Sequence, residues 1–150
     1  MWIESIYDRT RADVDLIRLD PTNENNKGAY NYTDLNRVET NCEYLMNKLN
    51  VYGFQEQLIL KKDWNVYDIP TKTQIDRIRE NIETLKNFCY ALLTEQIKYD
   101  NTMDYKKANA LEKILYDINE HIKEFNRIVN LNYNIAILPI RKKYIELRCI

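Results

Sequence analysis

The amino-acid sequence predicts a mainly α-helical fold: a bundle of three long helices, a short helix before them and a small β-hairpin or strand extension at the carboxyl end. Three apolar stripes of identical spacing predict the long helices, and residues that can cap a helix precede each stripe. The chain of 150 residues is long enough to bury a core. We expect a single domain, with the bundle over residues 1–131 and the β extension over residues 132–150.

Each long helix is predicted by five apolar residues spaced three, four, three and four apart. Residues at these spacings lie on one face of a helix, and burial is what rewards an apolar face. We expect the last helix to extend to about Val129. The three stripes are Leu35, Val38, Cys42, Leu45 and Leu49; Ile75, Ile78, Ile82, Leu85 and Cys89; and Ala108, Leu111, Leu115, Ile118 and Ile122.

Candidate capping residues stand at corresponding positions before the three stripes. Asn31, Thr71 and Asp104 can each accept a hydrogen bond from a backbone N–H that the first helical turn leaves unpaired. Gln74 follows Thr71 by three residues, which is the spacing of a capping box. We expect the helices to begin at these residues.

A shorter helix is predicted at the start of the chain, from Thr10 to Asp20. The polar stretch 21–28 has the composition of a loop. The apolar residues that we expect this helix to turn inward are Val14, Leu16 and Ile17.

Residues 51–70 are too irregular for another helix of this kind, so we expect a crossing segment, either a short strand or a single turn packed over the bundle. Trp64 is expected to fill a gap there, and its indole N–H would need a hydrogen-bond partner.

The carboxyl end changes from helical spacing to alternation. Alternating apolar residues on both sides of Pro139 predict two short strands, with the proline at an edge or a turn. A lone hairpin is marginally stable in water, so it needs a covering surface, either its own bundle or another chain. We expect the assembly interface here, formed by Tyr133, Ile135, Ile137, Arg141, Tyr144, Ile145, Leu147 and Ile150.

The basic run Arg141-Lys142-Lys143 has two interpretations. It could bind phosphate, but charges on an edge strand more often prevent aggregation, and we favour the second interpretation.

Composition excludes several classes of partner. The net charge of −1 and the pI of about 5.9 argue against a nucleic-acid binder. No apolar run approaches the length of about 18 residues that a membrane span needs, and acidic residues stand where a signal peptide would be basic. Three widely spaced cysteines do not suggest a disulfide framework. We expect no nucleic acid and no membrane as partners, and a protein made in a cytoplasm.

Candidate chemistry is sparse. His121, the one histidine, has Asp117 and Glu124 at helical spacing, but a metal site needs three or four converging ligands. We expect Cys42 and Cys89 to be core residues, and the pair Glu39 and Glu43, four residues apart, to lie on a solvated face. No phosphate-loop, zinc-protease or nucleophile-elbow motif is present. We therefore predict no catalytic residues, no cofactor and no metal.

Four segments of the chain resemble, in the same order, a helical domain of structural proteins from bacteriophages and prophages of Firmicutes. They are YDRTRADVD from Tyr7, GAYNYTDLNRVETNCEYL from Gly28, DWNVYDIPTKTQIDRIRENIETL from Asp63, and MDYKKANALEKIL from Met103. The resemblance covers most of residues 7–125, and the order of the segments is more specific than any one of them.

This resemblance implies a virion protein that acts by binding other virion proteins in the tail, baseplate or head-associated fibre apparatus. It would be present as a homo-oligomer or as symmetric copies, assembled in the cytoplasm of the bacterial host. The alternative is a non-virion, phage-encoded interaction protein that regulates or inhibits a host protein. Presence or absence in purified particles distinguishes the two.

Overall fold

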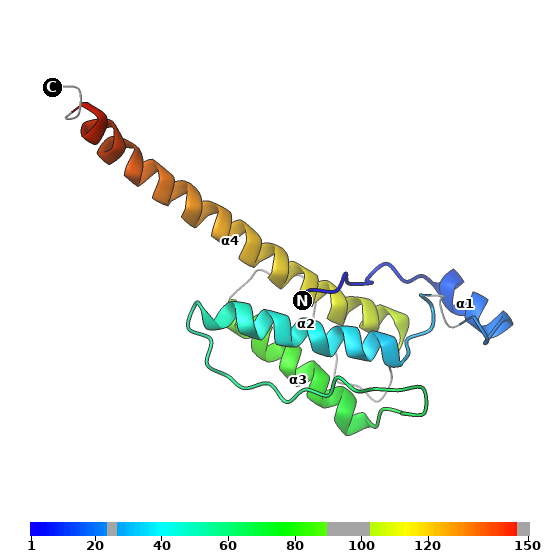
Figure 1. Ribbon diagram of the computed structural model, residues 1–150. Helices are drawn as coiled ribbons and strands as arrows, with labels where there is room; N and C mark the ends of the chain where they lie inside the picture. The colour runs from blue at the N-terminus through cyan, green and yellow to red at the C-terminus, as the bar shows by residue number, and fades with distance from the viewer. Residues whose placement is uncertain (24–26, 90–102, 147–150) are drawn as a thin grey trace. The chain divides into compact units, whose positions relative to one another are not determined.

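The computed structural model describes residues 1–23, 27–89 and 103–146, with side chains described as far as Asn130. Its elements are four helices, so the prediction of a mainly helical fold is confirmed (Figure 1). The chain divides into two units, Met1–Asn119 and Glu120–Ile150. The helices are α1 (Arg11–Leu19), α2 (Tyr32–Asn50), α3 (Lys72–Cys89) and α4 (Tyr105–Glu146).

The predicted stripes form the core. Every residue of the first and third stripes is buried, and the second stripe is buried at its three central positions. Helices α2 and α3 pack against each other, and the first half of α4 adds Ile114 to the buried residues of its stripe. Ile75 and Cys89, at the two ends of the second stripe, are half-buried.

The predicted caps are also present. Thr10 and Asn31 each form a capping box, with Asp13 and Asp34 as the reciprocal acceptors. Asp104 accepts a hydrogen bond at 2.9 Å from the third backbone N–H of its helix. Thr71 and Gln74 exchange the same reciprocal pair of hydrogen bonds at the start of α3.

Helix α1 differs from the prediction, because it buries no residue. Leu16 is 54% exposed, while Val14 and Ile17 are half-buried. The chain instead packs on α1 through Gly28, where an added Cβ would lie 2.1 Å from the carbonyl oxygen of Asp13. This close approach of two backbones requires glycine.

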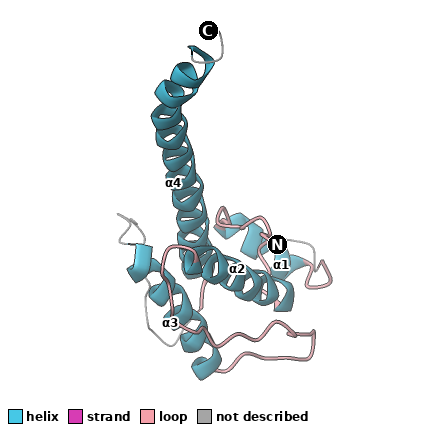
Figure 2. Ribbon diagram, turned by 60° about the vertical axis from the view of Figure 1, so that its left-hand side comes forward, coloured by secondary structure: helices cyan, strands magenta, loops and turns pink. Residues whose placement is uncertain are grey.

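The segment between α2 and α3 is a loop without a strand (Figure 2). The side-chain amide of Asn36 bonds both backbone groups of Trp64, accepting from its N–H at 3.0 Å and donating to its carbonyl at 2.8 Å. Earlier in the same loop, the carbonyl of Ile59 accepts hydrogen bonds from the side chains of Asn81 and Arg77 of α3. Trp64 is buried as predicted, but its indole N–H has no hydrogen-bond partner among the described residues.

At the carboxyl end α4 extends as helix through Glu146, and the described residues contain no strand. The β extension expected over residues 132–150 stays a prediction, because residues 147–150 and the side chains beyond Asn130 lie outside the described residues. A short apolar run fits more than one period. Ile128, Leu131, Ile135 and Leu138 are spaced three, four and three apart in the sequence, which also fits a helix.

Truncation of a core residue tests the bundle. We expect Ile82→Ala and Leu115→Ala each to lower the free energy of unfolding by about 2–5 kcal/mol, because both side chains are fully buried. Ile69→Ala is the matched control, since Ile69 is 88% exposed. Urea unfolding followed by circular dichroism measures the difference. Equal midpoints for Ile82→Ala and Ile69→Ala would contradict the assigned core.

Candidate functional site: a cationic cavity beside a buried charge network

Four charged side chains form a buried network inside the unit Met1–Asn119. Arg9, which precedes α1, donates from Nη2 to Asp34 Oδ1 at 2.7 Å and to Glu112 Oε1 at 2.8 Å. Arg37 of α2 donates from Nε to Glu112 Oε2 at 2.9 Å and from Nη2 to Oε1 at 2.8 Å. Arg37 also pairs with Asp34. The network therefore joins the start of the chain to α2 and to α4.

The network is electrically balanced, with two guanidinium groups and two carboxylates. The side chains of Arg9 and Glu112 have no exposed surface, and those of Asp34 and Arg37 keep only 6% and 10%. Desolvation offsets much of the attraction in such buried pairs. Removal of one partner, however, leaves a buried charge unpaired and costs about 3–5 kcal/mol of folding free energy. The network thus strongly favours the one arrangement in which all four groups meet.

The protonation states around the network follow from burial and charge. Burial alone would lower the pKa of the Arg37 guanidinium, but hydrogen bonds to Glu112 and the negative charges of Glu112 and Asp34 outweigh burial and raise that pKa. Burial raises the pKa of the Tyr30 hydroxyl, and the same two carboxylates raise it further. Arg37 is therefore charged and Tyr30 neutral at physiological pH.

Two asparagines hold the extended segment 1–9 by its backbone. Asn41 of α2 accepts from the N–H of Ile3 at 2.9 Å and donates to its carbonyl at 2.8 Å. Asn109 of α4 makes the same pair of bonds with the backbone of Arg9, at 3.2 and 2.8 Å. A side-chain amide offers the donor and acceptor that a neighbouring β-strand would offer.

Between the two positions held by these asparagines, side chains of the charge network form the hydrogen bonds to the backbone of segment 1–9. The N–H of Ile6 donates to Glu112 Oε2 at 2.8 Å, and the Arg9 guanidinium donates to the Ile6 carbonyl. Arg9 Nε also donates to the carbonyl of Lys27 at 2.9 Å. Every third residue of the segment is thus bonded to a side chain.

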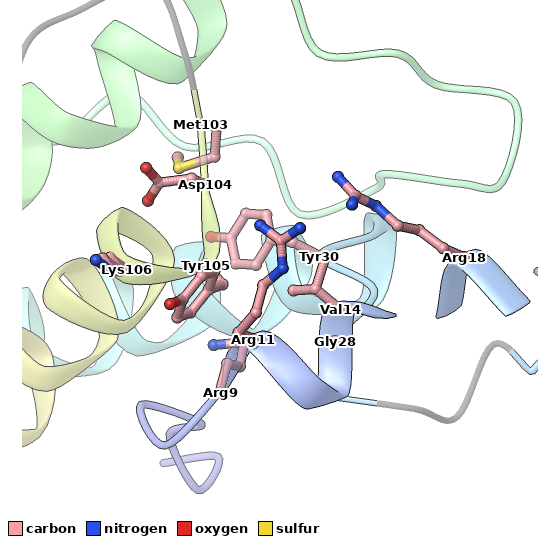
Figure 3. Close-up of a pocket in the computed structure, with 10 residues that line it drawn as sticks. All are labelled: Arg9, Arg11, Val14, Arg18, Gly28, Tyr30, Met103, Asp104, Tyr105 and Lys106. Carbon is pink, nitrogen blue, oxygen red and sulfur yellow. The ribbon is translucent and has the colours of Figure 1, made fainter. Parts of the chain in front are cut away.

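Beside the network, a cavity of about 560 Å³ opens between α1 and the start of α4 (Figure 3). Four of its lining residues are cationic: Arg9, Arg11 and Arg18, and Lys106 across from them on α4. Asp104 is the one acidic lining residue. The site is therefore rich in positive charge.

The cations of the cavity differ in how far their charge is neutralised. The charge of Arg9 is neutralised by Asp34 and Glu112 in the buried network. Arg11 Nε bonds both oxygens of Asp15 at 3.1 Å, and Arg18 reaches the same carboxylate only at 3.5 Å. Lys106 is exposed and has no ion pair within the described residues. Arg18 and Lys106 are the least neutralised cations of the lining.

Aromatic rings form another part of the wall. Tyr30 and Tyr105 both line the cavity, and the guanidinium of Arg9 lies 5.2 Å from the centroid of the Tyr30 ring. The Tyr30 hydroxyl is buried and has no hydrogen-bond partner in the described part of the chain. A buried donor of this kind is uncommon and calls for an explanation.

A second hollow, of about 300 Å³, also has Tyr30 in its lining and is less charged. Its lining includes the apolar residues Leu35, Ile69 and Pro70. Asp68, its acidic residue, is paired with Lys61 at 3.2 Å. This hollow lacks the unneutralised cations of the first.

The structure does not bring the histidine candidates together as a site. His121 is exposed on α4, whereas Asp117 is paired with Lys113 and Glu124 with Arg127. The described residues contain no group of three or more histidine, cysteine, aspartate or glutamate side chains placed to hold a metal ion.

The cysteines lie partly as predicted. Cys42 is buried in the core, and burial raises the pKa of its thiol. Cys89 is half-buried, and burial raises its thiol pKa to about 11. Both thiols are therefore protonated and weakly nucleophilic at neutral pH. Cys149 lies outside the described residues.

The prediction of a solvated face at Glu39 and Glu43 is wrong for Glu39. Glu39 is 1% exposed and forms a two-point ion pair with Arg77 of α3. Glu43 pairs with Lys62 of the following loop at 2.6 Å. A buried carboxylate is tolerated here because a guanidinium from the facing helix satisfies both of its oxygens.

The side chains of the predicted assembly interface lie outside the described residues, so that interface stays a prediction. Sequence reasoning missed the charge network, because the spacing of Arg9, Asp34, Arg37 and Glu112 along the chain does not mark them as partners.

Comparison of the chain with protein-family models, with curated proteins and with solved structures found no match. Among the described residues, none of the helices combines the length and hydropathy needed to cross a bilayer. Function is therefore inferred from the residues of this chain.

The charge network can be tested by removing one charge without changing shape. We expect Glu112→Gln to lower the free energy of unfolding by about 3–5 kcal/mol, because two buried arginines then share one carboxylate. Glu120→Gln, a more exposed position on the same helix, is the control and should unfold like the parent.

A double variant distinguishes charge balance from packing. Adding Arg37→Gln to Glu112→Gln restores neutrality, so we expect the double variant to lose less stability than the sum of the two single variants. Chemical unfolding of all four proteins measures this coupling. Strict additivity would show that the charges act independently.

Proposed function

We propose that this chain is a structural protein of a bacteriophage particle, a small module that assembles by protein–protein contacts in the tail, baseplate or head-associated fibre apparatus. The observation that carries the proposal is the exposure of large apolar side chains in the unit Glu120–Ile150. Ile128 is 44% exposed and Val129 47%, and Phe125 is 50% exposed. A helix gains most of its stability in water by packing an apolar face against something.

The loop between α2 and α3 supports the same proposal. Val66, Tyr67 and Ile69 are 58%, 90% and 88% exposed. Hydrogen bonds between the backbone of Trp64 and the side chain of Asn36 fix the loop next to these residues, so their side chains project from an anchored backbone. Exposed aromatic and aliphatic groups on fixed backbone suit a protein-binding surface.

The proposed partners are other virion proteins and further copies of this chain. In this proposal the protein works by binding, without catalysis, cofactor or metal, and without contact to nucleic acid or membrane. The carboxyl part of α4 supplies the assembly interface, whose proposed residues are Tyr133, Ile135, Ile137, Arg141, Tyr144, Ile145, Leu147 and Ile150.

The phage assignment rests on the resemblance. The segments that carry it contain Arg9, Asp34, Arg37 and Glu112, which tie three parts of the chain together. Residues with this role are constrained by the fold, so a resemblance in these segments is most simply explained by a common architecture.

Composition of purified particles tests the proposed location. We expect mass spectrometry of particles from a phage or prophage encoding this chain to find it in several copies per particle. A major capsid protein provides the internal standard. Recovery of the chain from the cell lysate but not from the particles would favour the regulator or inhibitor instead.

Self-association tests the exposed face of α4. We expect light scattering after size exclusion to find the full-length chain as an oligomer, and Ile128→Glu with Val129→Glu to shift it to monomer with an unchanged helix content. Glu120→Lys with Glu124→Lys is the control, since it alters two polar positions of the same helix. A parent that stays monomeric at high concentration would contradict self-association through this face.

A further inference from the structure

We propose that the cavity between α1 and the start of α4 binds a phosphate monoester, that is, a phosphate group carried on a small organic molecule (Figure 3). This inference is independent of the assembly role, because the cavity lies wholly within the unit Met1–Asn119. Charge, donor geometry and wall chemistry each support it.

The charge around the cavity favours an anionic ligand. Arg9 is neutralised in the buried network and contributes no excess charge. Arg11 and Arg18 share the single carboxylate of Asp15, and Asp104 is the one acidic residue in the lining. The three cations Arg11, Arg18 and Lys106 against these two carboxylates leave an excess of one positive charge. A phosphate monoester carries about −1.5 to −2 at neutral pH.

The arginines have donors to spare. Arg11 bonds Asp15 only through Nε, and Arg18 bonds it only through Nη1 at 3.5 Å. Their remaining nitrogens make no hydrogen bond to the described residues. Guanidinium groups bind phosphate through two parallel N–H donors, so the spare donors of the two arginines suit an oxyanion such as phosphate.

The Tyr30 ring supplies aromatic surface at the wall. Its hydroxyl is buried, has no hydrogen-bond partner among the described residues, and stays protonated because burial raises its pKa. In Figure 3 the ring lies behind the Arg11 guanidinium, with Tyr105 beside it.

The size and the apolar walls point to an esterified phosphate. At about 560 Å³ the cavity is in the range of sites for small organic ligands and is larger than phosphate alone needs. Val14, Met103 and Tyr105 line it together with the cations. These side chains offer apolar and aromatic surface to the organic part of the ligand.

Titration calorimetry on the full chain at low salt tests the proposal, with phenyl phosphate, inorganic phosphate and benzoate as probes. We expect saturable, salt-sensitive binding of phenyl phosphate. Arg18→Gln with Lys106→Gln should weaken it about tenfold or more, because charge-assisted hydrogen bonds are lost. Arg127→Gln with Lys123→Gln removes the same two charges from exposed positions of the other unit and should leave the affinity unchanged.

The remaining outcomes separate the sources of the phosphate. Binding of inorganic phosphate as tightly as phenyl phosphate would support the site and assign free phosphate as its ligand. Equal binding of benzoate, or an unchanged affinity in the Arg18→Gln, Lys106→Gln variant, would overturn the proposal. Since both replaced side chains are exposed, circular dichroism melts of this variant should match the parent and exclude misfolding as the cause.

Discussion

The fold of the unit Met1–Asn119 depends on the buried ion pairs of Arg9 and Arg37 with Asp34 and Glu112. These groups come from three separate parts of the chain, and each would be costly to bury alone. Apolar packing can accept several alignments of neighbouring helices, whereas four charges that must all be paired accept few. The network therefore selects one alignment of α2 against α4 and one path for the segment before α1.

Side-chain amides extend the same principle to segments that have no regular structure. Asn41 and Asn109 satisfy the backbone of residues 1–9, and Asn36 does so for Trp64. Buried backbone groups need partners, and here helices provide them without a sheet. As a consequence, the loops are hydrogen-bonded to the helices. Exposed apolar side chains such as Tyr67 and Ile69 therefore project from an anchored backbone.

The sequence predicted what depends on local spacing. The stripes and caps were confirmed because burial and capping recur at fixed intervals along a helix. The charge network was not predictable in this way, because Arg9 and Glu112 are 103 residues apart and each looks like an ordinary surface charge beside an apolar stripe. The cationic cavity was missed for the same reason. The apolar run at the carboxyl end is too short to separate a period of two from a helical one.

The distance along the chain between Arg9 and Glu112 also orders the events of synthesis. The first nine residues leave the ribosome long before α4 exists, and Arg9 has to wait for a carboxylate translated 103 residues later. At roughly 5–20 residues per second the delay is about 5–20 s. During that time α2 and α3 can pack against each other, but the segment 1–9 still lacks its partners on α4. It therefore docks last, when the beginning of α4 emerges from the ribosome.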